Sequence, residues 1–298
     1  IDNLDFIVTA DLAWTDTARI SDIVLPATHF YEVEDIVIGM GAHPYLQYSE
    51  KAVEPAYEAK SDSDIARLFA EKMGVGECFD KTDHEYMAEM IDSDYSKAYN
   101  VTLERLREEG AILVLEDPWY NFGGDQTFAT PDGRMQFYDE TPQPRFDYGQ
   151  ELPIDRERFA CFFPPTEAWP GTKAQKKYPL VLLSARPRYR IHSQWFGTKW
   201  LRELDPEPTV QIHPDDAGPR GIKDGDYVEI YNDRGRVVAK VIVTDGIRPG
   251  SMTYPKGWQR HQHKARSFSE VNSTKHDPIG VNSSFFDATV DVRVWEEN

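Results

Sequence analysis

The chain has 298 residues, of which 40% are apolar and 12% aromatic, so it is long enough for two domains with cores of their own, and no apolar run approaches the ~18 residues of a membrane-spanning helix. Its formal net charge is −18, and the excess is uneven: residues 1–174 carry 35 acidic against 14 basic side chains, whereas residues 175–298 carry 16 against 19. The acidic part argues against nucleic-acid binding, while the later part has the charge to hold a compact anion such as a pyrophosphate.

The start of the chain resembles the lead-in to a buried strand. DFIVTA (residues 5–10) is an apolar run typical of a buried strand, and no charged-then-apolar leader precedes it. We therefore expect the chain to be a fragment, so its start gives no indication of the cellular compartment. The two cysteines, Cys78 and Cys161, exclude a disulfide framework and lie in no ligand-spaced cluster, which predicts inert thiols.

The first 140 residues predict part of an α/β domain. A turn and a short helix near 17–20 separate residues 5–10 from a second apolar run, 23–25, as at the edge of a parallel sheet. Residues 61–73 form an amphipathic helix between Ser61 or Ser63 and Gly74. A further helix is expected between about Asp83 and Glu109.

The rest of the chain predicts a mainly β domain. Residues 128–140 carry the turn sequence PDG between two strand-like runs, which predicts a hairpin. Residues 141–178 are Pro-rich and are either a linker or a segment draped over a surface. We therefore expect an α/β segment over 1–140 and a second domain over 179–298. Six short β-branched runs in that domain, separated by turn residues, predict a six-stranded barrel. Residues 227–243 contain its clearest hairpin.

Polar side chains follow the first strand of this domain. Arg186, Arg188 and Arg190 offer forked donors to phosphate or a ring carbonyl, and His192, Ser193 and Gln194 add mixed donors and acceptors suited to a heterocycle such as a pterin. Composition alone slightly favours a solvated loop followed by a capped helix over a cofactor contact, so both interpretations stay open.

A second polar stretch covers residues 257–268. His261 and His263 lack a Cys or carboxylate at ligand spacing, so we expect no metal site there. The polar loop over 271–284 is either solvent-facing or matched to a base or pterin edge. The sequence has no nucleotide-binding glycine motif, nucleophile elbow or paired catalytic carboxylates, so it predicts no complete catalytic site.

The order of several stretches carries a family resemblance. WTDTARISDIVLPATHFYEVEDI, TPDGRMQFYDE, RYRIHSQWFGT and the run from IHPDDAGPRG to PGSMTYPKGW together resemble the C-terminal portion of molybdopterin oxidoreductases of the dimethyl sulfoxide reductase family. Residues 190–258 are most similar to the dimethyl sulfoxide and trimethylamine N-oxide reductase branch.

The resemblance implies a division of labour. The α/β segment and a barrel of the molybdopterin dinucleotide-binding type would hold two molybdopterin guanine dinucleotides. Molybdenum would be bound by upstream residues. The resemblance does not decide whether the whole enzyme contains an iron–sulfur cluster. The residues that match the family's cofactor contacts are Asp11, Thr15, Thr17, Ser184, Arg186, Arg190, His192, Ser193, Gln194, Trp258, Asn272 and Asn282. No catalytic or metal-binding residue is expected in this chain.

The implied function is that of a whole enzyme. It would reduce an S-oxide, an N-oxide or another small oxygenated substrate by oxygen-atom transfer, and the fragment alone is expected to be inactive. Its partners would be that substrate, the N-terminal remainder of the same protein and, where one exists, an electron-transfer subunit, without nucleic acid or direct membrane insertion. The alternative is a non-catalytic module that binds a nucleotide or a protein partner.

Overall fold

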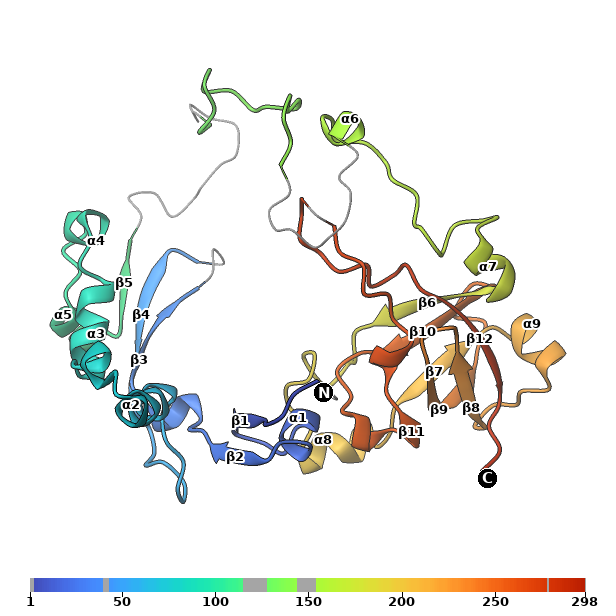
Figure 1. Cartoon of the computed structure of the whole chain (residues 1–298), viewed down its shortest axis with the longest axis horizontal. Helices are drawn as coiled ribbons and strands as arrows, with labels where there is room; N and C mark the ends of the chain where they lie inside the picture. The colour runs from blue at the N-terminus through green and yellow to red at the C-terminus, as the bar shows by residue number, and fades with distance from the viewer. Residues whose placement is uncertain (1–2, 40–42, 115–127, 144–153, 278, 298) are drawn as a thin grey trace. The chain divides into compact units, whose positions relative to one another are not determined.

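A computed structural model of the chain describes residues 3–39, 43–114, 128–143, 154–277 and 279–297. The chain divides into two compact units, Ile1–Gln126 and Thr127–Asn298, and each is described by itself (Figure 1). The domain limits expected from the sequence stay a prediction, and residues 144–153 of the expected linker lie outside the described residues.

The first unit starts with a strand–helix–strand motif. Strand β1 (Val8–Asp11) lies parallel to β2 (Ile23–Pro26), and the short helix α1 (Asp16–Arg19) connects them. The helix begins after Thr15, whose hydroxyl accepts a hydrogen bond from the backbone N–H of Ala18, so a sequence-encoded N-cap sets its start. The parallel pair and the short helix predicted from the sequence are confirmed.

The core of the first unit lies between a three-stranded antiparallel sheet and helices. Strand β4 (Tyr45–Ser49) pairs on one side with β3 (Asp35–Ile38) and on the other with β5 (Ala111–Leu113). Leu106 and Ile112, 0% and 2% exposed, lie in this core. The shorter elements of this unit are η1 (Phe30–Glu32) and η2 (Gly76–Phe79).

Helix α2 (Asp62–Met73) forms as predicted. The Ser61 hydroxyl accepts from the Asp64 N–H, and Gly74 ends the helix with a φ of 75°, a conformation that favours glycine. Leu68 and Phe69, two members of its expected apolar stripe, are each 46% exposed.

The helix expected between about Asp83 and Glu109 is not continuous. Three short helices take its place: α3 (Asp83–Met90), α4 (Asp94–Ala98) and α5 (Leu103–Glu109). Ser93 and Thr102 each turn a hydroxyl to a backbone N–H three residues on, because Ser and Thr compete for backbone donors and thereby start new helices. Asn100, with a φ of 50°, interrupts the helical backbone conformation between α4 and α5.

The hairpin expected over residues 128–140 is also wrong. Its turn forms, with hydrogen bonds from the Phe128 N–H to the Gly133 carbonyl and from the Gly133 N–H to the Thr130 carbonyl, but no strand pair flanks the turn among the described residues. Tyr138 instead bridges Phe159, whose ring lies 4.8 Å from its own. The pairing therefore joins this segment to residues 158 and 159, which follow α6 (Ile154–Glu157), instead of forming a hairpin.

The second unit contains a closed barrel of six strands, as predicted. Around the ring the order is β9, β7, β10, β6, β12, β8 and back to β9, and β6 and β10 are parallel neighbours (Figure 1). The strands are β6 (Leu180–Ala185), β7 (Thr209–Ile212), β8 (Tyr227–Tyr231), β9 (Arg236–Val243), β10 (Ser251–Pro255) and β12 (Thr289–Val294). The expected hairpin is the β8–β9 pair. Closure removes the unpaired edges that an open sheet would expose.

Alternation along the strands fills the barrel. Leu182, Val210 and Met252 are all 0% exposed and belong to one core cluster. The remaining elements surround the barrel: α7 (Lys173–Lys177), α8 (Lys199–Leu204), α9 (Pro214–Ala217), η3 (Gly218–Arg220), η4 (Arg260–Gln262), β11 (Ala265–Arg266) and η5 (Phe268–Glu270).

The expected linker is fastened to the barrel where the structure describes it. The carboxylate of Asp287, 8% exposed, accepts hydrogen bonds from the backbone N–H groups of residues 166, 167 and 168 and from the Thr166 hydroxyl. Glu167 also pairs with Arg234 at 2.7 Å. Residues 166–168 therefore lie against the barrel surface and are not a free tether.

Candidate cofactor-binding site at one end of the barrel

Strand register places two of the expected cofactor segments at one end of the barrel. Because β6 and β10 are parallel and Ser184 pairs with Tyr254, the loops that follow both strands leave from the same end. The chain enters β12 beside the same part of β6, since the Leu182 N–H donates to the carbonyl of Ala288. The side chain of Lys256 lies over the ring of Phe285, 5.7 Å from its centroid, and so connects the second loop to this third segment.

Arg190, in the loop after β6, is buried against Trp258 of the loop after β10. Its side chain is 2% exposed, its Nη2 donates to Asp205 Oδ2 at 3.0 Å, and its guanidinium carbon lies 3.5 Å from the ring centroid of Trp258. Burial lowers the pKa of Arg190, against the opposing effect of Asp205. The sequence predicted Arg190 and Trp258 as separate contacts, and the structure stacks one on the other.

The two loops touch through a glycine. Gly257 has a φ of 91°, and a Cβ added to it would lie 1.8 Å from the carbonyl oxygen of His192. His192 and Trp195 themselves have positive φ values, 51° and 69°, around the turn in which the Gln194 N–H donates to Ile191. Residues other than glycine that are held at positive φ carry backbone strain, and such residues occur mostly at functional sites.

The other predicted barrel residues differ in exposure. Arg186, His192, Ser193, Gln194 and Asn282 are exposed. The backbone carbonyl of Asn282 accepts a hydrogen bond from the backbone N–H of Asp277. In contrast, Ser184 and Asn272 are partly buried, and the Ser184 hydroxyl and Asn272 Oδ1 are enclosed atoms without a hydrogen-bond partner among the described residues.

The predicted residues of the first unit hold their own turn together. Asp11 follows directly from β1, and its carboxylate accepts from the Ala13 N–H at 3.2 Å and from the Thr15 hydroxyl at 3.1 Å. Thr17 lies exposed on α1. Two of these three side chains therefore already have local partners, while their position after a parallel strand is the one favoured for ligand binding.

Two residues of the Arg190 cluster escaped the sequence analysis. Asp205 follows α8 directly and is the ion-pair partner of Arg190. Arg202, one turn earlier, places its guanidinium carbon 5.8 Å from the Trp258 ring centroid. Burial is the larger cause of the lowered pKa of Arg190, and the positive charge of Arg202 lowers that pKa further. A periodic polar face on a short helix gives no signal that would single them out.

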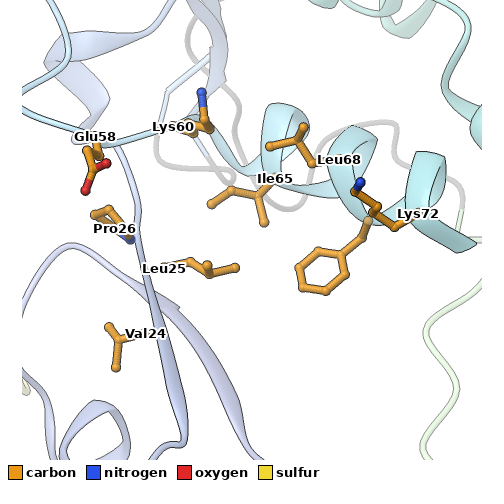
Figure 2. A pocket seen from close by; sticks show the side chains of 9 residues that line it. Val24, Leu25, Pro26, Glu58, Lys60, Ile65, Leu68 and Lys72 are labelled. Atoms are coloured by element: carbon orange, nitrogen blue, oxygen red, sulfur yellow. The ribbon is translucent and has the colours of Figure 1, made fainter.

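An apolar hollow of about 460 Å³ lies in the first unit, apart from the predicted residues. Figure 2 shows Val24, Leu25 and Pro26 of β2 on one side, with Ile65 and Leu68 of α2 on the other. None of the predicted cofactor residues lines it.

The described residues contain no group of three or more His, Cys, Asp and Glu side chains placed to hold a metal ion. No helix in that part of the chain is long and apolar enough to cross a membrane. Cys78 and Cys161 are both exposed and free.

Two family models match the chain. Residues 180–289 match the "Molydopterin dinucleotide binding domain", and residues 1–72 match "Molybdopterin oxidoreductase". The chain belongs to the dimethyl sulfoxide reductase family of molybdopterin oxidoreductases. The loops that carry Arg190 and Trp258 thus lie within the residues that match the dinucleotide-binding domain.

Individual family members agree. The chain is 34% identical over 294 residues to a putative catalytic subunit of dimethyl sulfoxide reductase from Halobacterium salinarum, covering 97% of this chain and 34% of that protein. It is 32% identical to the dimethyl sulfoxide/trimethylamine N-oxide reductase of Cereibacter sphaeroides, covering 86% and 33%. The chain therefore spans about a third of the length of these relatives.

A solved structure of the family shares the fold. Acetylene hydratase from Pelobacter acetylenicus superimposes with a TM-score of 0.75 over 98% of this chain and 41% of that one, at 20% identity. The fold assignment made from the sequence, an α/β segment followed by a barrel of the dinucleotide-binding type, is confirmed.

Proposed function

We propose that the chain is the cofactor-binding part of a molybdenum bis(molybdopterin guanine dinucleotide) oxidoreductase. The whole enzyme would reduce an S-oxide, an N-oxide or another small oxygenated substrate by oxygen-atom transfer. Names of relatives that act on dimethyl sulfoxide and trimethylamine N-oxide support this class of substrate. The further partners would be the remainder of the same protein and, where one exists, an electron-transfer subunit.

One observation carries the proposal. Four of the nine barrel residues that match the family's cofactor contacts have enclosed polar atoms without a hydrogen-bond partner among the described residues. The atoms are Ser184 Oγ, Arg190 Nε and Nη1, Trp258 Nε1 and Asn272 Oδ1. An unsatisfied buried polar atom costs about 1–3 kcal/mol, so its concentration at predicted contacts favours a ligand that satisfies it.

The chemistry of these atoms fits a pterin dinucleotide. Arg190 and Trp258 supply only donors, which match phosphate oxygens or a ring carbonyl. Asn272 Oδ1 is an acceptor for a ring N–H, and the exposed Arg186 adds a second guanidinium without a carboxylate partner among the described residues. These residues would bind and orient the cofactor, and Asp205 would hold Arg190 in position.

The bound molybdenum cofactor supplies the two-electron chemistry of oxygen-atom transfer. The residues of this chain contribute binding and orientation, because none of them is expected to ligate the metal or to transfer a proton. The family assignment also favours an enzyme over a non-catalytic nucleotide- or partner-binding module.

The proposal is tested by cofactor content in the full-length protein. Trp258→Phe removes one donor but keeps the aromatic ring under Arg190, and Ser184→Ala removes one hydroxyl. Both variants should be purified with less pterin and less molybdenum, and should reduce dimethyl sulfoxide more slowly with a reduced viologen dye as electron donor.

Thr253→Ala is the matched control, since its hydroxyl lies on the neighbouring strand and bonds Gln211 at 3.2 Å. Its pterin content should equal that of the wild type. Full pterin and molybdenum occupancy in both test variants would refute the contact assignment. A full-length protein that carries no pterin at all would refute the proposed function.

A further inference from the structure

Strand β1 of the first unit exposes one apolar side to water. Within the strand, Val8 and Ala10 are exposed while the two residues between and after them are half-buried, so alternate side chains divide between an open face and a covered one. The residues that flank the strand continue this exposure, with side chains 60–63% exposed at Leu4, Phe6, Leu12 and Trp14. Apolar side chains gathered in this way on a soluble domain mark an interaction site.

The outer edge of β1 is also unpaired. In the described part of the chain, its sheet consists of β1 and β2 alone. The carbonyls of Ile7 and Asp11 accept backbone N–H groups from the side of β2. Because alternate residues of a parallel strand face the same neighbour, the N–H groups of Val8 and Ala10 point to the outer edge. Parallel sheets are found almost only with more strands and with both faces covered, so this pair is the margin of a larger structure.

The hollow of about 460 Å³ adjoins the same sheet. Strand β2 lines one side of it and α2 the other, as Figure 2 shows. Leu68 and Phe69 of α2 lie in this lining and are each 46% exposed, although they belong to the apolar stripe of the helix. The charged side chains that complete the lining are Glu58, Lys60 and Lys72. The apolar stripe of α2 therefore lacks a covering layer within the described part of the first unit.

We propose that this side of the first unit is the docking surface for the remainder of the same protein. The docking surface comprises the outer edge and exposed face of β1 and the hollow between β2 and α2. The occupant adds a strand along β1 through backbone hydrogen bonds and places apolar side chains in the hollow. The inference rests on the proposed function, in which the chain is one part of a longer enzyme.

Length and charge favour this occupant over a second copy of the chain. The chain covers 34% of its relative from Halobacterium salinarum, so about two-thirds of an enzyme of that length is available to cover the surface. Residues 1–72, which contain β1, β2 and most of α2, match the "Molybdopterin oxidoreductase" family model. Residues 1–126 carry 27 acidic against 9 basic side chains, so two copies of this unit would repel each other.

Hydrogen–deuterium exchange of the full-length protein and of the 298-residue chain tests the proposal. The amides of Val8 and Ala10 should exchange at least about a hundredfold more slowly in the full-length protein, because a docked strand accepts their hydrogen bonds. The amides of Ile230 and Val237, paired within the barrel and 0% exposed, are the control and should exchange equally slowly in both proteins. Equal exchange of Val8 and Ala10 in the two proteins would overturn the proposal.

A substitution in the hollow tests the proposal independently. In the full-length protein, Leu68→Asp should lower the melting temperature by at least about 4 °C, because it places an unpaired carboxylate under the docked part. The same substitution in the 298-residue chain, where Leu68 faces water, should change it by less than about 2 °C. Met90→Asp is the matched control in the full-length protein, since Met90 lies on α3, 68% exposed and outside the hollow, and its effect should also stay below about 2 °C.

Equal shifts for Leu68→Asp and Met90→Asp in the full-length protein would also overturn the proposal. So would a 298-residue chain that sediments as a dimer with Val8 and Ala10 already protected, since a second copy would then be the occupant. The proposed function fails separately. A full-length protein without pterin but with a protected β1 edge supports the docking surface and refutes the cofactor function. A pterin-loaded enzyme whose Val8 and Ala10 amides exchange as fast as in the 298-residue chain refutes the docking surface alone.

Discussion

Substituting Asp287 tests how the segment before the barrel is held in place. Four hydrogen bonds converge on this carboxylate, at 2.7 Å from the N–H and hydroxyl of Thr166, 2.7 Å from the Glu167 N–H and 2.8 Å from the Ala168 N–H. Burial alone would raise the pKa of Asp287, but these donors outweigh it and the pKa is lowered. The carboxylate is therefore charged in the folded protein at neutral pH.

Asp287→Asn should lower the free energy of unfolding by about 2–3 kcal/mol at pH 7. A hydrogen bond to a charged acceptor contributes roughly 1.5–3 kcal/mol. The asparagine side chain also replaces one acceptor oxygen by an NH2 group, which would face backbone N–H groups and could form no hydrogen bond with them. The whole sum of four bonds is not lost, because Thr166 is exposed and water replaces part of the interaction.

Urea denaturation followed by tryptophan fluorescence measures the loss, and its pH dependence checks the cause. A carboxyl group whose folded pKa is depressed stabilises the protein above its unfolded pKa of about 3.9, and this contribution disappears as the pH falls through the folded value. The difference between wild type and Asp287→Asn should therefore persist from about pH 7 to pH 5 and shrink below about pH 4.

Glu296→Gln serves as the control, because it neutralises an exposed carboxylate near the other end of β12. It should change the stability by less than about 0.5 kcal/mol. An Asp287→Asn variant within that same margin of the wild type at pH 7 would refute the reasoning.

Three further predictions concern charge and packing. Asp205→Ala should destabilise the protein by about 3–5 kcal/mol in urea denaturation, because it leaves the Arg190 guanidinium buried beside Arg202 without its carboxylate; a loss below about 1 kcal/mol would contradict this. Leu182→Ala, at a fully buried position, should lower the free energy of unfolding by about 2–5 kcal/mol, whereas Leu68→Ala, at a position 46% exposed, should lower it by less than about 1 kcal/mol. Similar losses of stability in the two variants would show that the apolar stripe of α2 is covered. Raising sodium chloride from about 0.1 M to about 1 M should raise the melting temperature, since residues 1–126 carry 27 acidic against 9 basic side chains and repel one another; a falling melting temperature would argue against self-repulsion.

The sequence predicted the barrel better than the segment before it. Each barrel strand is a short β-branched run bounded by turn residues, so local composition already contains both the strand and its ends, and the Asn232–Gly235 turn closes its hairpin as expected. The stretch from Asp83 to Glu109 has helical composition throughout, and its breaks depend on where Ser93 and Thr102 cap, which periodicity alone does not decide.

Long-range contacts were out of reach of the sequence. Asp287 and Thr166 lie 121 residues apart, and no local pattern marks either as a partner of the other. For the same reason, Asp205 and Arg202 were missed beside the predicted Arg190 and Trp258. The expected cofactor contacts came from the resemblance to a family, which supplied positions but not the stacking of Arg190 on Trp258.

The glycine contact between the loops after β6 and β10 has a consequence for how this end of the barrel responds to change. With a Cβ excluded at Gly257 by the carbonyl of His192, neither loop can shift far without displacing the other. We therefore expect the two loops to move together. A ligand that orders either loop orders both, and replacing only one of them with the loop of a relative would break the fit that both share.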